Sequence, residues 1–156
     1  MPVDTPAQLK SLTPFDLEVL QDKACGLTDE QVGAKRNNIS SNTVKGWLRV
    51  IYDKLGYHDK TKEAEEIRIP AARAACTVLR AGKIVGPYKG SVVPDFTREE
   101  LSILDLVSLG YTTNQISGYF PFGEERVKSH LKSAGEKCGT ASRIQIAATA
   151  IVYKLI

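Results

Sequence analysis

Two pairs of basic residues, each spaced four positions apart, are the part of the sequence best suited to specific chemistry. They are Lys45 with Arg49, and Lys128 with Lys132. Side chains four positions apart lie on one face of a helix, so each pair would present two positive charges side by side. Paired cations of this kind neutralise the phosphates of a nucleic acid backbone. The pairs therefore make a nucleic acid the first candidate ligand.

Positive charge is concentrated around both pairs, although the formal net charge of the 156 residues is only +3. Residues 35–60 hold six basic and two acidic side chains, and residues 126–143 hold five basic and one acidic. The rest of the chain is therefore net acidic. A charged face on one helix is usually only a solvated surface, but its recurrence at a second place favours contact with DNA.

Other kinds of site find little support. His58 and His130 have no cysteine or carboxylate arranged around them, and Cys25, Cys76 and Cys138 are too far apart for a CxxC zinc site. No nucleophile–base motif and no phosphate-binding loop is present. We therefore expect no enzyme activity, no metal and no cofactor.

Composition and targeting patterns indicate a cytoplasmic protein. Apolar residues make up 42% of the chain and charged residues 25%, close to the average of globular proteins. No apolar run reaches the roughly 18 residues that a membrane span needs, and the N-terminus carries no secretory signal pattern. The widely spaced cysteines argue against a disulfide framework. We expect reduced thiols that pack in the core, and no contact with a membrane.

The sequence also contains an internal repeat. Residues 12–32 match residues 96–116 at an offset of 84, and residues 44–56 match residues 127–139 at an offset of 83. The identical pairs include Thr13/Thr97, Leu17/Leu101, Leu20/Leu104, Gly26/Gly110, Thr28/Thr112, Gln31/Gln115, Val44/Val127, Lys45/Lys128, Leu48/Leu131, Lys54/Lys137 and Gly56/Gly139. An offset held over about forty residues indicates a tandem duplication. We call residues 1–84 the first repeat and residues 95–156 the second repeat.

Each repeat is predicted to fold as four helices. Thr or Ser followed three positions later by Asp, Glu or Gln marks helix starts, and a following glycine marks helix ends. The expected helices are 14–25, 29–36, 41–55 and 60–81 (with Pro70 as a candidate break), then 98–109, 113–120, 124–138 and 143–155. No segment alternates apolar and polar residues as a strand would. The sequence therefore predicts an all-α protein, with a loose tail at 1–8 and a linker at 85–94.

The stretches LTPFDLEVL, GLTDEQV and ISSNTVKGWLRVIYDKLG resemble the LuxR-type (GerE-like) helix-turn-helix, whose members share patterns close to LTxxExEVL, GLxxxEIA and ISxxTVKxHxxxIxxKLG. The resemblance covers most of residues 12–64 and is weaker over 96–156, whose end resembles the family's fourth, often dimerising helix. It implies two tandem four-helix domains whose third helix enters the DNA major groove. The DNA-contacting residues that it implies are Thr43, Lys45, Gly46, Arg49, Arg126, Lys128, Ser129 and Lys132.

The two repeats depart from this family pattern in different ways. The first has an extra residue in its turn, with polar Arg36 and Asn37 where the family buries an aliphatic side chain, which predicts a less firmly seated groove helix. The second has Gly123 instead of a serine N-cap, and Gly135 inside its third helix costs roughly 1 kcal/mol relative to alanine. We expect the first repeat to contact DNA more strongly.

Two functions are consistent with these patterns. One is a sequence-specific transcriptional regulator that binds double-stranded DNA through the third helix of each repeat. The alternative is a protein-interaction module, similar to sigma region four, in which one or both repeats bind RNA polymerase or another regulator. A homodimer through the last helix is a further expectation. The linker spans at most about 36 Å when extended, so it would limit how far apart two half-sites can lie.

Overall fold

The computed structural model describes residues 6–57 and 69–156, and in these ranges the chain consists of helices joined by turns, without a strand. The helices are α1 (Pro6–Lys10), α2 (Pro14–Ala24), α3 (Asp29–Ala34), α4 (Ser41–Lys54), α6 (Pro70–Arg80), α7 (Arg98–Ser108), α8 (Thr113–Ser117), α9 (Glu124–Cys138) and α10 (Arg143–Val152). The all-α prediction is confirmed. No helix in the described ranges has the length and apolar character needed to cross a bilayer.

The local signals at helix ends work as the sequence predicts. Thr13, Thr28 and Thr112 each form a capping box, in which the hydroxyl accepts from a backbone N–H and the side chain three positions later accepts in return. The four glycines expected to end helices, at 26, 56, 110 and 139, have φ between 71° and 88°. Glycine adopts this left-handed region without strain, so these residues set where each helix stops.

Helices α8 and α10 end three residues before their predicted ends, at Ser117 and Val152. Two other helices differ more from the prediction. Pro6–Lys10 forms α1 where the sequence predicts a loose tail. A proline suits the first helical position, and Leu9 packs against the core of the first repeat. The helix expected from residue 60 falls partly outside the described residues, and α6 begins at Pro70.

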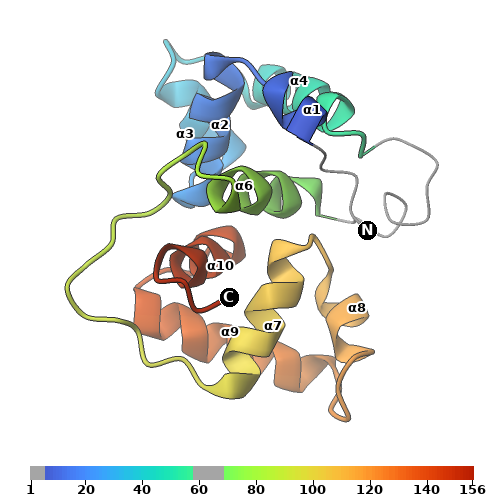
Figure 1. Ribbon diagram of the computed structural model, residues 1–156, viewed down its shortest axis with the longest axis vertical. Coiled ribbons are helices and arrows are strands. Elements are labelled where there is room, and N and C mark those ends of the chain that lie inside the picture. The colour runs from blue at the N-terminus through green and yellow to red at the C-terminus, as the bar shows by residue number, and fades with distance from the viewer. Residues whose placement is uncertain (1–5, 58–68) are drawn as a thin grey trace.

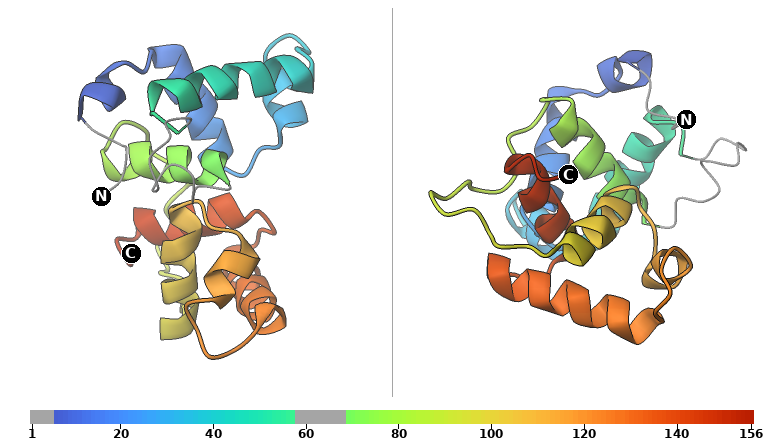
Figure 2. Two further views of the ribbon diagram at one scale, coloured as in Figure 1. Left: turned by 90° about the vertical axis from the view of Figure 1, so that its right-hand side faces the viewer. Right: turned by 60° about the horizontal axis from the view of Figure 1, so that its bottom comes forward.

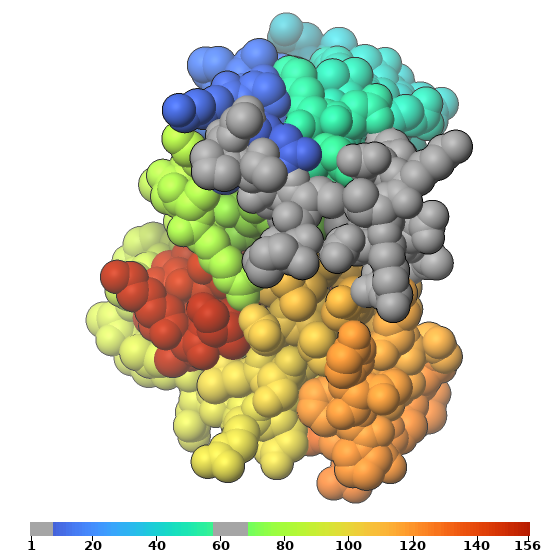
Figure 3. Space-filling view, turned by 45° about the vertical axis from the view of Figure 1, so that its right-hand side comes forward, coloured from blue at the N-terminus to red at the C-terminus, as the bar shows by residue number. Residues whose placement is uncertain are grey.

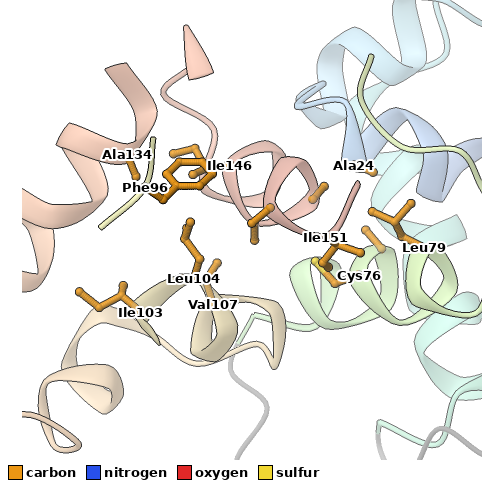
Figure 4. Packing of buried hydrophobic residues seen from close by; sticks show 14 of the residues in the cluster. Ala24, Cys76, Leu79, Phe96, Ile103, Leu104, Val107, Ala134, Ile146 and Ile151 are labelled. Atoms are coloured by element: carbon orange, nitrogen blue, oxygen red, sulfur yellow. The ribbon is translucent and has the colours of Figure 1, made fainter. Parts of the chain in front are cut away.

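Two apolar cores hold the molecule together. The smaller one lies within the first repeat, around fully buried Leu20 and Ile51. The larger one combines the second repeat with residues of the first, among them Cys76 and Leu79 of α6. Figure 4 shows Cys76 next to Ile151 of α10. The repeats are therefore parts of one packed body.

The contacts between the repeats are reciprocal. Helix α6 packs on α10 and α7, and α10 packs on α6 and α2. The N–H of Ile69, which caps α6, donates to the carbonyl of Gly110 at 2.8 Å. At the matching place, Gly26 lies so close to the start of α10 that a Cβ there would be 2.4 Å from Gln145 Oε1. The fourth helix of each repeat thus contacts the first helix of the other repeat. Such reciprocal contacts are typical of a two-fold symmetric pair.

This packing places α4 and α9 toward opposite ends of the long axis, with α6 and α10 between them (Figures 1 and 2). In the space-filling view of Figure 3, the surface of α4 lies at the top and the α8–α9 region lies at the lower right. Helix α10 packs on α6, α7, α9 and α2 of its own chain, and most of its apolar residues are buried.

The linker at 85–94 contains no helix and is held at both ends. The amide of Gln21 donates to the carbonyl of Gly86 and accepts from its N–H, both at 2.8 Å. The hydroxyl of Tyr153 donates to the carbonyls of Gly90 and Val92, at 2.9 and 3.1 Å. Because α6 and α10 are in contact, their packing sets the separation of α4 and α9, and the reach of the linker does not.

Candidate nucleic-acid interface

A tight turn with unusual backbone geometry positions α4 after α3. Asn37 and Asn38 both have positive φ, 59° and 57°, a conformation that asparagine tolerates better than most residues. A Cβ on Gly33 would lie 1.9 Å from the carbonyl oxygen of Ile39, so only glycine fits there. These residues accommodate the extra residue of the turn, and Val44 of α4 stays fully buried. The helix is therefore firmly seated, unlike the expectation from the sequence.

Helix α4 is amphipathic, with an apolar face that is buried and a polar face that is exposed. Val44, Leu48 and Ile51 are buried, as the spacing predicts. The residues proposed to contact DNA lie on the opposite side: Thr43, Lys45 and Arg49 are exposed, and Gly46 is half-buried with nothing within 4 Å of a Cβ. A ligand could therefore approach the backbone of α4 closely at Gly46.

Three other cations near α4 are neutralised inside the protein. Lys35 Nζ lies 2.6 Å from Asp22 Oδ1, and Arg36 pairs with the second oxygen of the same carboxylate. Lys54 Nζ lies 2.7 Å from Asp16 Oδ2. The local charge counted from the sequence therefore overstates what a ligand would meet.

Lys45 and Arg49 differ from these cations, since neither is in an ion pair with any residue of the described ranges. They are one turn apart on the exposed face of α4. Their two charges are available to an external anion.

The ion pair at the end of α4 has a counterpart in the second repeat. Lys137 Nζ lies 2.7 Å from Glu100 Oε1, at the positions that match Lys54 and Asp16. The Glu100 side chain is only 2% exposed and also accepts from the Ser133 hydroxyl at 3.3 Å. Each pair ties the last turn of the third helix to the start of the first, so Lys54 and Lys137 are structural.

Helix α9 exposes its four proposed contact residues as well, but among acidic neighbours. Those residues are Arg126, Lys128, Ser129 and Lys132. Glu124 and Glu125 occupy the first turn of α9, and Lys128 Nζ lies 3.2 Å from Glu125 Oε1. These acids were not counted with the basic residues of 126–143, because both stand directly before that range. These acids reduce the positive charge that α9 presents, so its surface is less suited to phosphates than that of α4.

Two matched positions of the third helices hold packing residues. Trp47 of α4 meets Phe15 edge-on, with ring centroids 4.8 Å apart. His130 of α9 lies against Phe122, with centroids 5.4 Å apart, and its Nε2 is buried without a hydrogen-bond partner in the described residues. Both side chains are half-buried and contact an aromatic ring of their own repeat.

The structure explains why a glycine occupies position 135 inside α9, which the sequence did not reveal. A Cβ at this position would lie 2.4 Å from the carbonyl oxygen of Thr140. The glycine lets the turn between α9 and α10 fold back onto α9. The helix-propensity penalty is therefore the smaller of two effects at this site.

No arrangement for redox or metal chemistry accompanies these surfaces. Cys25, Cys76 and Cys138 are free thiols, and burial raises the pKa of Cys76 to about 12. Burial also raises the pKa of Cys25 and of Cys138. Within residues 6–57 and 69–156, no three His, Cys, Asp or Glu side chains gather as a metal site would require.

Comparison with family models, with curated proteins and with solved structures gives no match to this chain.

Proposed function

We propose that the chain is a sequence-specific, double-stranded DNA-binding regulator of transcription that acts in the cytoplasm and places α4 in the major groove. The observation that supports this most is the free pair Lys45 and Arg49. Lys35 and Arg36 before α4 are held by Asp22, and Lys54 at its end is held by Asp16. Lys45 and Arg49 face outward. Two charges without an ion pair in the described ranges, on the exposed face of a helix that follows a short helix and a turn, suit contacts to DNA phosphates.

The remaining proposed contacts fit the same arrangement. Thr43 is an exposed hydrogen-bonding side chain near the N-terminus of α4, the part of a recognition helix that meets base edges. Gly46 gives a low surface on the same face, which permits close approach of the DNA. We propose that the two repeats are LuxR-like domains and that the second supports binding by the first, because its acidic residues weaken any phosphate contact by α9.

A selection from random duplexes with the full chain tests this proposal. We expect one preferred sequence, and we expect Lys45→Glu/Arg49→Glu to lose binding to it while remaining folded by circular dichroism. Arg98→Glu/Lys154→Glu is the matched control, since it makes the same charge change at exposed sites of the second repeat, outside α4 and α9. A folded α4 variant that binds as well as the unmodified chain would refute the assignment.

A second candidate function is protein docking by the second repeat, to RNA polymerase or another regulator. The observation that favours it is the turn before α9, where Tyr119 is 61% exposed and stacks on Tyr111 at 5.9 Å. Glu125 lies nearby in sequence and is exposed. Exposed aromatic rings are common at protein interfaces, and the carboxylates would suit a basic partner. Tyr119→Ala would then weaken partner binding and leave the salt dependence of DNA binding unchanged.

A further inference from the structure

A cleft of about 650 Å³ opens between α9 and the start of α10. Leu131 and Ile146 form apolar walls, and exposed Ala141 contributes only a methyl group to the lining. The volume lies in the range of small-molecule sites, about 300 to 1,000 Å³. None of the residues that carry the proposed DNA contact of α4 lines it.

The first repeat shows what this place holds when it is filled. Its residues Tyr52 and Tyr57 stack with ring centroids 6.2 Å apart, and Tyr57 is only 6% exposed. By the repeat offset of 83, these tyrosines correspond to Gly135 and Thr140, and both replacements line the cleft. The second repeat has thus lost two aromatic rings at the place where the cleft lies.

The charged side chains around the cleft are mainly cationic. Lys128, Lys132 and Arg143 line it, with Glu136 as the one carboxylate among its lining residues. The guanidinium of Arg143 has a single hydrogen bond, from Nη1 to Thr113 Oγ1 at 3.4 Å. Its Nε and Nη2 are buried without a partner in the described part of the chain. Unsatisfied donors of a buried cation are costly, and since Arg143 also lines the cleft, an anion bound there would be attracted by its positive charge.

We propose that this cleft binds a small molecule that combines one or two aromatic rings with an anionic group. The rings would occupy the apolar space between Leu131 and Ile146, and the anion would lie toward Lys132 and Arg143. This inference stands on the cleft alone and does not depend on the proposed DNA binding. A bound anion would also reduce the positive charge that Lys128 and Lys132 offer to other partners.

Binding of 8-anilinonaphthalene-1-sulfonate, an aromatic sulfonate, to the full folded chain tests the proposal. Amide chemical shifts should locate it, with the largest changes at Gly135, Gly139 and Ala141. N-phenyl-1-naphthylamine has the same rings without the sulfonate and should bind about tenfold more weakly. Perturbed amides on the exposed apolar linker, at Val85 or Val92, would show adsorption to an apolar surface and would overturn the proposal.

A matched pair of variants at one exposed position separates charge from shape. Ala141 lines the cleft and is exposed, so Ala141→Glu and Ala141→Gln should both fold. We expect Ala141→Glu to weaken binding of the sulfonate about tenfold relative to Ala141→Gln, because a carboxylate there repels an anion in the cleft. Lys132→Gln should also weaken it, and Lys10→Gln should not. Equal affinities of the two Ala141 variants would overturn the proposal.

Discussion

The contact of α4 with DNA phosphates can be measured as a change in salt dependence. We predict that Lys45→Gln/Arg49→Gln makes the dependence of duplex affinity on salt less steep. Both side chains are exposed and in no ion pair within the described ranges, so both charges are available to phosphates. Removing them removes two contacts without adding repulsion.

The size of the effect follows from counterion release. Each phosphate contact contributes about 0.9 to the slope of log affinity against log salt, so the loss of two makes the slope shallower by about 1.8. This contribution vanishes near 1 M salt, so at about 0.1 M it amounts to about 1.8 logarithmic units. The double variant should therefore bind roughly 60-fold more weakly at about 0.1 M salt and nearly as well as the unmodified chain near 1 M.

Fluorescence anisotropy of a labelled duplex, titrated at several salt concentrations, measures both slopes. Arg98→Gln/Lys154→Gln removes the same charge from exposed sites of the second repeat, outside α4 and α9, and should leave the slope nearly unchanged. Lys128→Gln/Lys132→Gln should reduce it by less than the α4 variant, because Glu125 already pairs with Lys128. An unchanged slope for the α4 variant, or an equal change in the control, would refute the assignment of α4.

Three further predictions concern the framework that holds the site. Glu100→Gln should destabilise the chain by about 1 to 3 kcal/mol in urea unfolding, because it leaves the Lys137 ammonium without its carboxylate, while exposed Glu99→Gln should have little effect. Gly135→Ala should destabilise by about 1 to 3 kcal/mol, since its Cβ would meet Thr140, whereas Gly46→Ala has open space and should stabilise by up to about 1 kcal/mol. Cys76, whose pKa burial raises to about 12, should react with iodoacetamide only at the rate of unfolding, and fast labelling in the native state would contradict its buried position.

The helices could be predicted from the sequence because their ends depend on local chemistry. A capping threonine and a left-handed glycine act within a single turn, so Thr13 and Gly26 could be recognised without tertiary information. The helix of Pro6–Lys10 was missed because five residues carry too little periodicity to detect. Its Leu9 is held by packing against the first core, whose residues range along the chain from Leu12 to Val78.

The candidate site was predictable only in part, because the pairing of its cations depends on tertiary contacts. The exposed positions on α4 follow from helical periodicity, and the structure places Lys45 and Arg49 where the spacing indicates. Which cations remain free is a tertiary property. Asp22 lies in α2, yet it takes the charges of Lys35 and Arg36, and no periodicity within one helix reveals such a pairing.

Because the two repeats share a core, the DNA affinity of an isolated repeat differs in meaning from that of the same repeat in the full chain. Residues of α6 that would otherwise face water, such as Cys76 and Leu79, are buried by the second repeat. A first repeat cut out on its own would expose this apolar face and would tend to associate with a second copy through it. Its DNA affinity would then report a different assembly. The contributions of α4 and α9 are therefore best separated by charge variants in the intact chain, where the packing of α6 on α10 stays constant.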